Sequence, residues 1–388
     1  MSSSQHELGQ YFTTNIELKQ KVFEFILNEP TNILEPSIGQ GDLVKFINEK
    51  KQNIIFDMYE IDKKIKILDK VEKDKIIYGD FIDQNIQKTY KTIVGNPPYV
   101  KTKGGNLYID FTEKCYNLLE ECGELIFIVP SDFLKLTCAS KLLNTMMNNG
   151  TFTHIYHPHN EKMFENASID VIIFRYCKNN SLENKVYYND KLMYLTNSNG
   201  LITFSTEENN NNNNIYFKDY FDIYVGLVTG KEEVYKNEEL GNIEVLNGEN
   251  KVEKYIFIEK YPCENEKINT YLLKHKDELI NRGIRKFNDK NWFEWGAPRN
   301  MKNIANNLGK DCIYIYNLTR KTEVAFVGKV QYFGGGLLIL IPTKKCNLNK
   351  IVDFINSDKF KENFMFSGRF KIGHRCIVNS LIPNECSF

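Results

Sequence analysis

The sequence of 388 residues contains no stretch of 18 consecutive apolar residues. A helix needs about 20 predominantly apolar residues to cross a bilayer, so we expect no transmembrane segment and no membrane partner. The start of the chain, Met1 to Glu7, also lacks the basic segment and the apolar stretch of a secretory leader. We therefore expect a cytoplasmic protein.

Cysteine pairs of the kind that bind zinc are missing as well. The nine cysteines are scattered between Cys115 and Cys386, and none forms a Cys-x-x-Cys pair. This spacing argues against a zinc site, and we expect no metal cofactor. An odd number of cysteines without a disulfide framework is typical of reduced thiols in the cytoplasm.

The net charge of the chain is zero, but basic and acidic residues are unevenly distributed along it. Residues 271–388 contain 20 Lys and Arg against 10 Asp and Glu, which leaves 30 against 40 in residues 1–270. A neutral protein with a basic third can use that part on a polyanion such as nucleic acid. A lysine-rich surface without a partner is the alternative, and the basic residues alone do not decide between them.

The length and one polar tract indicate two domains. Single cores rarely grow beyond about 250–300 residues, and six consecutive asparagines at 209–214 are typical of a surface loop or linker. We expect a first domain over 1–208 and a second, basic domain of mixed, β-containing structure over 215–388.

The first domain alternates short apolar runs with helical patterns. Strands separated by helices of this length predict a mostly parallel α/β sheet covered on both faces. Thr14 to Glu17 has the pattern of a capping box that opens a helix. We expect strands at 32–35, 54–60, 75–78, 92–95, 124–129, 152–156 and 170–176, and further helices at 42–50, 108–121 and 132–148.

The most informative stretch is Asn96-Pro97-Pro98-Tyr99, directly after the expected strand at 92–95. Two prolines stop the strand and fix a rigid turn that presents an amide, backbone carbonyls and an aromatic ring. The Asn96 oxygen and a proline carbonyl can accept the two hydrogens of a planar amino group while Tyr99 stacks on the attached ring. That arrangement suits methyl transfer to an exocyclic or amide nitrogen.

A glycine turn earlier in the chain predicts a ligand site. Gly39 and Gly41 lie between the first strand and the next helix, where they let the backbone approach a ligand closely. The same turn carries Glu35 and Asp42, which would repel a pyrophosphate but can bind an ammonium group. This favours a zwitterionic ligand such as S-adenosyl-L-methionine over NAD.

Two further acidic positions follow the next strands. Glu60 ends the second strand, where a carboxylate can accept hydrogen bonds from ribose hydroxyls. Asp80 and Phe81 follow the third strand. The Asp80 carboxylate can accept a hydrogen bond from the amino group of an adenine, and Phe81 can cover the face of the adenine ring. Because all these residues follow strand ends, they are expected at the one edge where open α/β sheets bind ligands.

Together these motifs resemble the γ class of adenine-N6 DNA methyltransferases of type II restriction-modification systems, typified by the TaqI enzyme. The resemblance covers about residues 5–180, and the cofactor motifs precede Asn96 as in that class. It implies a Rossmann-like class I methyltransferase domain, with a seven-stranded sheet that has one antiparallel strand, followed by a target-recognition domain.

The resemblance also implies roles for individual residues. Gly9 to Thr14 match the first cofactor motif, although Thr14 stands where the family usually has proline, and Phe127 and Pro130 match a motif beside the cofactor. Tyr176 matches an aromatic that packs against the flipped base. The implied cofactor-binding residues are Tyr11, Thr13, Glu35, Ser37, Gly39, Gly41, Glu60, Ile61, Asp80, Phe81, Asn96 and Phe127, and the implied catalytic residues are Asn96, Pro97, Pro98, Tyr99 and Tyr176.

The second domain is expected to hold double-stranded DNA. Arginine can address guanine with two hydrogen bonds, whereas lysine mostly neutralises phosphate. The candidate DNA-binding residues are Lys231, Arg320, Lys321, Arg369, Lys371, His374 and Arg375. We interpret Trp292 and Trp295 as packing residues, and His154, His157 and His159 as surface histidines rather than a metal cluster.

The expected reaction is direct methyl transfer from S-adenosyl-L-methionine to N6 of a flipped adenine. Three alternatives stay open: a protein-glutamine N5-methyltransferase, an RNA base methyltransferase, and a non-catalytic DNA-binding subunit. We expect a monomer, with a cognate restriction endonuclease, where one exists, that forms no stable complex with it. The sequence does not indicate which bases are recognised.

Overall fold

The computed structural model describes residues 9–102, 105–165, 167–179, 184–208 and 215–383. The chain divides into two compact units, of which unit 1 is Met1–Asn211 with Phe366–Gly368 and unit 2 is Asn212–Met365 with Arg369–Phe388. The linker expected at 209–214 lies outside the described residues. No helix in the described ranges is long and apolar enough to cross a membrane.

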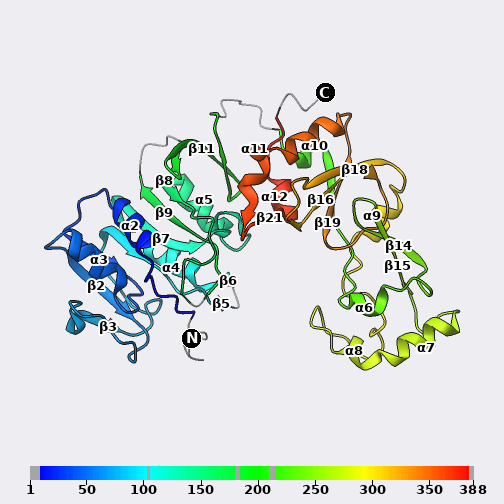
Figure 1. The fold of residues 1–388 in the computed structure, drawn as a ribbon, viewed down its shortest axis with the longest axis horizontal. Coiled ribbons are helices and arrows are strands. Elements are labelled where there is room, and N and C mark those ends of the chain that lie inside the picture. The colour runs from blue at the N-terminus through cyan, green and yellow to red at the C-terminus, as the bar shows by residue number, and fades with distance from the viewer. Residues whose placement is uncertain (1–8, 103–104, 166, 180–183, 209–214, 384–388) are drawn as a thin grey trace. The chain divides into compact units, whose positions relative to one another are not determined.

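Unit 1 is built on a ten-stranded sheet in the order β12-β11-β10-β8-β9-β7-β4-β1-β2-β3. Figure 1 labels β11, β8, β9, β7, β2 and β3 of this sheet. Parallel pairs join β1 to β2 and β4, β2 to β3, and β4 to β7, whereas β9 runs antiparallel to both β7 and β8. The seven expected strands with one antiparallel member are therefore confirmed. Their bounds are β1 Asn32–Glu35, β2 Ile55–Glu60, β3 Ile76–Tyr78, β4 Tyr90–Gly95, β7 Leu119–Pro130, β8 Gly150–Tyr156 and β9 Val171–Lys178.

Three strands that we did not predict extend this sheet beyond β8. They are β10 Lys185–Tyr188, β11 Lys191–Ser198 and β12 Leu201–Ser205, of which β10 pairs parallel to β8 and the other two add as an antiparallel meander. The two connecting turns, Asn189-Asp190 and Asn199-Gly200, have positive φ at both positions. Asn-Gly between apolar runs is a strong hairpin signal, so the sequence contained the information for at least the second turn.

Helices flank the sheet at bounds that partly differ from our predictions (Figure 1). Asn15, rather than Thr14, caps α2 (Ile16–Glu24), and its side chain accepts from the backbone N–H groups of Glu17 and Leu18. The helix expected at 108–121 is α4 (Leu107–Asn117), because the chain enters β7 at Leu119. The helix expected at 132–148 is a short 3-10 turn followed by α5 (Ser140–Asn148), and α3 spans Asp42–Lys50 as expected.

The sheet of unit 1 is buried on both faces. Along β7, Leu125, Phe127 and Val129 belong to one hydrophobic cluster, while Ile126 and Ile128 belong to the other. Successive side chains of a strand point to opposite faces, so this near-continuous apolar run fills two cores. Polar side chains are therefore found mainly where the strands end.

Unit 2 contains the β-rich structure that we expected. Its main sheet is antiparallel, in the order β13-β19-β16-β18, and a separate hairpin joins β14 to β15. Trp292 and Trp295 are each only 2% exposed, which confirms that they are packing residues. The remaining elements of unit 1 are β5 Lys101–Thr102 and β6 Gly105–Asn106, and β20 Met365–Phe366 has one residue in each unit. The elements of unit 2 are β13 Phe221–Val225, α6 Glu232–Tyr235, β14 Ile243–Gly248, β15 Lys251–Tyr255, α7 Glu266–Lys274, α8 Lys276–Ile280, α9 Met301–Ala305, β16 Asp311–Tyr316, β17 Leu318–Thr319, β18 Ala325–Lys329, β19 Leu337–Pro342, α10 Leu348–Asn356, α11 Asp358–Lys361, β21 Arg369–Lys371 and α12 His374–Val378.

Candidate active site

A cavity of about 260 Å³ lies where β1, β2, β3 and β4 end, and a smaller hollow of about 20 Å³ shares several of its residues. Ten of the twelve expected cofactor residues line one or both of them. They are Tyr11, Thr13, Glu35, Ser37, Gly39, Glu60, Ile61, Asp80, Phe81 and Asn96. Residues that follow the ends of different strands, and that lie far apart in the sequence, therefore lie together at one edge of the sheet, as we expected.

The other two expected cofactor residues, Gly41 and Phe127, lie behind the cavity wall. Gly41 precedes α3 with φ of +93°, and a Cβ there would meet Val71 Cγ2 at 2.8 Å, so glycine serves the backbone turn. Phe127 is fully buried in β7, and its Cε1 would lie 3.1 Å from a Cβ built on Gly95. It supports the end of β4 and does not line the cavity.

Glu60 is fixed at the cavity edge by two backbone groups. Its Oε2 accepts from Gly39 N at 2.8 Å, and its Oε1 accepts from Asp62 N at 2.9 Å. Gly39 has φ of +58°, a conformation that glycine adopts without strain. Each carboxylate oxygen can accept a second hydrogen bond, so the group remains able to bind hydroxyl donors.

Glu35 is the most deeply buried acid of the site, with 1% of its surface exposed. Burial raises its pKa to about 8, with a smaller contribution from the charge of Glu60, although Ser37 N donates to Glu35 Oε1 at 3.2 Å. Burial also raises the pKa of Asp42 and of Glu60. Burial therefore disfavours the ionised forms of these carboxyl groups. A cationic ligand bound beside them would stabilise those ionised forms.

The amide of Asn96 is held in one orientation. Asn96 Nδ2 donates to Tyr11 O at 2.6 Å and to Thr13 Oγ1 at 3.1 Å, while Asn96 Oδ1 accepts from Tyr99 Oη at 2.7 Å. Tyr99 Oη also lies 3.1 Å from Ile128 O. The nitrogen of the amide thus faces the loop at 9–13, and its oxygen keeps one acceptor position besides the one that Tyr99 uses.

Aromatic rings surround Tyr99. Tyr11 stacks on it with ring centroids 5.3 Å apart and planes at 28°, and Tyr108 and Phe164 meet it edge-on at 5.9 and 6.3 Å. Phe164 also lies 5.7 Å from the ring of Tyr11. We did not predict Phe164 from the sequence, because it lies in a connection between two predicted strands and no sequence pattern marks it.

Tyr176 is not part of this site, contrary to the role implied by the resemblance. Its side chain is fully buried and donates from Oη to Met146 O at 2.7 Å. Tyr176 pairs with Leu125 near the start of the ladder between β7 and β9, whereas Val171 pairs with Pro130 at the cavity end. Since β9 is antiparallel, its last residues point away from the edge that the other strands share.

Gln10 provides an independent sign of a polar ligand. Gln10 lines the larger cavity, yet both its Oε1 and its Nε2 are buried without a hydrogen-bond partner among the described residues. An unsatisfied buried polar group costs about 1–3 kcal/mol. A ligand that both donates and accepts hydrogen bonds, such as an amino-acid zwitterion, would satisfy this amide.

His159 is exposed, as we expected, and His154 is half-buried, but His157 is not a surface histidine. His157 is 4% exposed, and its Nε2 lies 2.8 Å from Asp170 Oδ1. Asp170 Oδ2 accepts from Ser131 Oγ at 2.6 Å, so His157 belongs to a buried polar cluster. The described residues contain no group of three or more His, Cys, Asp or Glu that could hold a metal ion.

Two sequence segments that we expected to contact DNA come together in unit 2. Strand β17 pairs antiparallel to β21, with Thr319 opposite Phe370 and Leu318 opposite Lys371. This ladder brings Arg320 and Lys321, which follow β17, to the same small sheet as Arg369 and Lys371. The pairing was not visible in the sequence, because about 50 residues separate the segments.

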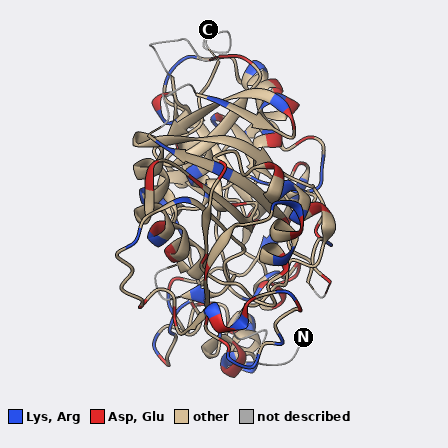
Figure 2. Ribbon diagram, turned by 90° about the vertical axis from the view of Figure 1, so that its left-hand side faces the viewer, with Lys and Arg blue, Asp and Glu red and all other residues tan. Residues whose placement is uncertain are grey.

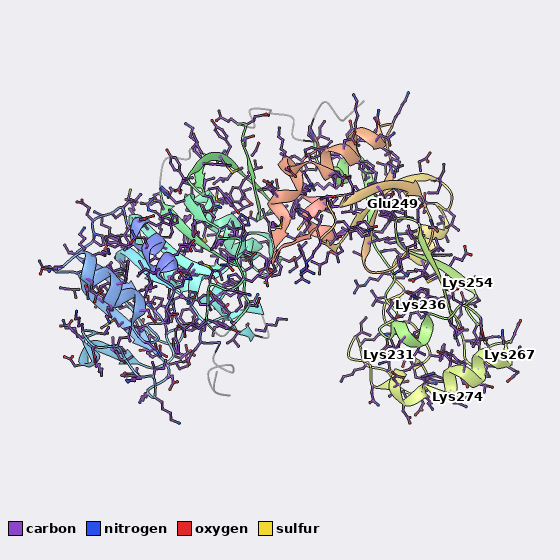
Figure 3. The ribbon with its side chains drawn as sticks, in the orientation of Figure 1. Lys231, Lys236, Glu249, Lys254, Lys267 and Lys274 are labelled. Atoms are coloured by element: carbon purple, nitrogen blue, oxygen red, sulfur yellow. The ribbon has the colours of Figure 1, made fainter. Side chains whose placement is uncertain are left out.

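Other basic candidates already have partners within unit 2. Lys231, beside α6 in Figure 3, pairs with Glu233 at 2.7 Å and with Glu278 at 2.6 Å. His374 Nε2 lies 3.1 Å from Ile223 O. In the view of Figure 2, basic and acidic residues are interspersed along the ribbon.

Comparison with known proteins confirms the resemblance to restriction-modification methyltransferases. Residues 40–164 match the Eco57I restriction-modification methylase family. The type II methyltransferase M.HincII of Haemophilus influenzae is 29% identical over 204 residues, which are 47% of this chain and 39% of that protein. The ribosomal RNA small subunit methyltransferase A of Mesomycoplasma hyopneumoniae is 38% identical over 100 residues, which are 24% of this chain and 38% of that protein.

A solved structure extends the likeness to both units. The type IIL restriction-modification enzyme MmeI, in complex with DNA, has a TM-score of 0.63 at 11% identity, covering 98% of this chain and 69% of that one. At this identity the match shows the fold, which is a class I methyltransferase fold in unit 1. The aligned region spans less than half the length of the curated relatives.

Proposed function

We propose that this chain, of which residues 40–164 match restriction-modification methylases, is a site-specific DNA adenine-N6 methyltransferase that uses S-adenosyl-L-methionine. The observation that carries the proposal is the meeting of two features at one sheet edge. A cavity lined by Glu60 and Asp80 lies beside Asn96, whose amide is already oriented by Tyr99. The first feature suits the cofactor and the second suits an amino group.

The residues of the cavity fit S-adenosyl-L-methionine. Glu60 would accept from the ribose hydroxyls, Asp80 from the adenine amino group, and Glu35 would face the ammonium group. The Gln10 amide, which has no hydrogen-bond partner in the part of the chain that the structure describes, and the raised pKa of Glu35 both support a zwitterionic ligand that carries a cationic group. When bound, the cofactor supplies an electrophilic methyl group on sulfur.

Asn96 and Pro97 would hold the target nitrogen. The amino lone pair of adenine is delocalised into the ring, so it is a weak nucleophile. Hydrogen bonds from N6 to the free acceptor position of Asn96 Oδ1 and to the Pro97 carbonyl favour a pyramidal nitrogen with its lone pair available. Positioning and electrostatics then supply most of the catalysis, and no covalent enzyme adduct is needed.

Tyr99 would stack on the target base after it leaves the duplex. Base extrusion is required because N6 lies inside the base-paired stack, and stacking returns roughly 1–3 kcal/mol per base. Phe164 lies edge-on to Tyr99 and is placed to form another wall of the base site. Tyr11 stacks on Tyr99, so a base entering on that face would displace it.

The ladder of β17 and β21 is our proposed contact with the phosphates of double-stranded DNA. Arg320, Lys321, Arg369 and Lys371 supply the positive charge there. We further propose a cytoplasmic monomer whose cognate endonuclease acts on the same sequence without a stable complex. The restriction-modification type of the matched family supports only the pairing with an endonuclease.

An RNA base methyltransferase is the second candidate, because the match to a ribosomal RNA methyltransferase covers part of unit 1. The deciding experiment gives the full chain methyl-labelled cofactor with duplex DNA, structured RNA or a peptide release factor. We expect label in DNA as N6-methyladenine, identified by mass spectrometry of the nucleosides. N4-methylcytosine would refute the choice of base, and label in RNA or protein would refute the choice of substrate.

Cofactor binding without label in any of these substrates would favour a non-catalytic subunit. Mapping of methylated adenines in DNA from cells that express the chain would then identify the recognition sequence.

A further inference from the structure

The turn after β3 carries Asp80 and Phe81, which we propose to meet the adenine ring of the cofactor. Within the turn, Asp80 Oδ1 accepts from Ile82 N at 2.9 Å, and Gln84 N donates to Phe81 O at 3.2 Å. The turn lies beyond the last residue of β3, Tyr78. Its conformation is therefore not fixed by a strand ladder, and the surrounding side chains can add to the hydrogen bonds that the turn makes within itself.

Lys114 on α4 binds three carbonyl oxygens of this turn. Its Nζ lies 2.5 Å from Phe81 O, 2.8 Å from Ile82 O and 2.6 Å from Gln84 O. An ammonium group has three N–H donors, so donors and acceptors match in number. The same Nζ lies 4.8 Å from the centroid of the Phe81 ring, which is within the range of a cation–π contact.

The helix that carries Lys114 holds the turn at a second point. Phe111, one helical turn earlier, stacks on Phe81 with ring centroids 5.2 Å apart and planes at 27°. Leu107 and Phe111 also line the cavity. One helix therefore fixes both the ring of Phe81 and the backbone around it.

We infer that Lys114 is a positioning residue for the cofactor, because its three hydrogen bonds fix the turn at 80–84 in the conformation that meets an adenine ring. This inference rests on the proposed use of S-adenosyl-L-methionine. A lysine that served folding alone would change the stability of the protein. A positioning lysine changes the affinity for ligands that contain adenine.

The test replaces Lys114 in the full chain and measures ligand binding by calorimetry. Lys114→Met keeps the length of the side chain and removes all three donors. We expect the Kd for S-adenosylhomocysteine to rise about tenfold, the equivalent of one lost charged hydrogen bond. The Kd for 5′-methylthioadenosine, which has adenine and ribose but no amino-acid end, should rise by the same factor. Lys141→Met, at an exposed lysine of α5, is the matched control and should change neither Kd.

A second measurement covers the case in which Lys114→Met folds poorly. Lys114→Arg keeps N–H donors and should recover most of the affinity, whereas a Kd no better than that of the methionine variant would overturn the inference. S-inosylhomocysteine has oxygen in place of the adenine amino group. The ratio of its Kd to that of S-adenosylhomocysteine should fall in Lys114→Met, because Asp80 is no longer held against that amino group.

An unchanged Kd in Lys114→Met, or a loss of kcat at saturating cofactor with an unchanged Kd, would also overturn the inference. Both outcomes leave the proposed function intact, provided that the wild-type chain binds S-adenosylhomocysteine. A wild-type chain that does not bind it would overturn the proposed function and this inference together.

Discussion

Tyr99 Oη lies 2.7 Å from Asn96 Oδ1, so the hydroxyl of one residue of the tetrapeptide orients the amide of another. An amide can present either its oxygen or its nitrogen to a target, and only the oxygen can accept from an amino group. The Tyr99 side chain therefore has two separable uses, because its hydroxyl orients Asn96 and its ring, on which Tyr11 now stacks, would stack on the target base.

Tyr99→Phe separates these two uses. The ring remains, so we expect extrusion of the target base, measured by 2-aminopurine fluorescence at that position, to equal that of the wild type. The amide loses its orienting partner, and kcat should fall about tenfold, the effect of one hydrogen bond. Tyr99→Ala should lower the fluorescence as well. Equal losses of fluorescence in the two variants would contradict a separate role for the hydroxyl.

Asn96→Ala should lower kcat by at least about 10²-fold, because it removes an acceptor aimed at the reacting nitrogen. Single-turnover methylation of duplex DNA measures this loss. Binding of S-adenosylhomocysteine should stay within about threefold of the wild type. Thr13→Val removes one of the two acceptors of Asn96 Nδ2 and should give an intermediate kcat. Substantial methylation by Asn96→Ala would refute the proposed role of the amide.

Glu35 makes cofactor binding dependent on pH. Its pKa of about 8 means that the carboxyl is protonated at neutral pH in the free protein, whereas a bound ammonium favours the ionised form. Binding below pH 8 therefore releases a proton, and the Kd for S-adenosylhomocysteine should fall by up to about tenfold per pH unit from pH 6.5 to 8. Calorimetry in buffers of different ionisation enthalpy measures the released proton.

The control for this prediction is Glu35→Gln, in which the pH dependence should disappear. The same raised pKa has a consequence for folding. Because the folded state of the free protein keeps the proton up to about pH 8 and the unfolded chain loses it near pH 4.5, the free protein should lose stability as the pH rises between these values.

Tyr176→Phe should affect stability and not catalysis. It removes the buried hydrogen bond from Tyr176 Oη to Met146 O, which should lower the free energy of unfolding by about 1 kcal/mol. Urea denaturation measures this decrease, and kcat should stay unchanged. A reduced kcat at unchanged stability would instead indicate that Tyr176 acts in the active site.

The ladder of β17 and β21 predicts which basic residues make DNA binding sensitive to salt. The double variant Arg320→Ala with Arg369→Ala should reduce the slope of log Kd against log salt concentration for duplex DNA by about 1 for each phosphate that is no longer neutralised. Lys231→Ala is the matched control, because Lys231 is already paired with Glu233 and Glu278. An equal change of slope in both variants would contradict the choice of this ladder.

The sequence predicted well what depends on local pattern. Apolar runs of strand length located the seven strands of the methyltransferase core. The rule that ligands bind at strand ends grouped Glu35, Glu60 and Asp80, which line two adjoining cavities, although their roles remain predictions. The prolines after Gly95 also marked the turn that holds Asn96. These features need no knowledge of distant contacts.

The sequence predicted poorly what depends on strand direction and on distant pairing. The role that the resemblance implies for Tyr176 requires it at the opposite end of the sheet. The residues around Tyr176 do not themselves indicate that β9 runs antiparallel to β7. Phe164 lies in the connection between β8 and β9, and its contacts with Tyr11 and Tyr99, about 150 and 65 residues earlier, depend on the tertiary fold. The pairing of β17 with β21 was hidden for the same reason.

The loop at 9–13 lines the cavity through Gln10 and Tyr11 and also binds the amide of Asn96. If the proposed function holds, the cofactor and the target base share one wall, and their binding free energies are linked. By thermodynamic reciprocity, any factor by which the cofactor changes the affinity for the target base must also be the factor by which the base changes the affinity for the cofactor. A four-state binding cycle with S-adenosylhomocysteine and duplex DNA would measure that single coupling energy.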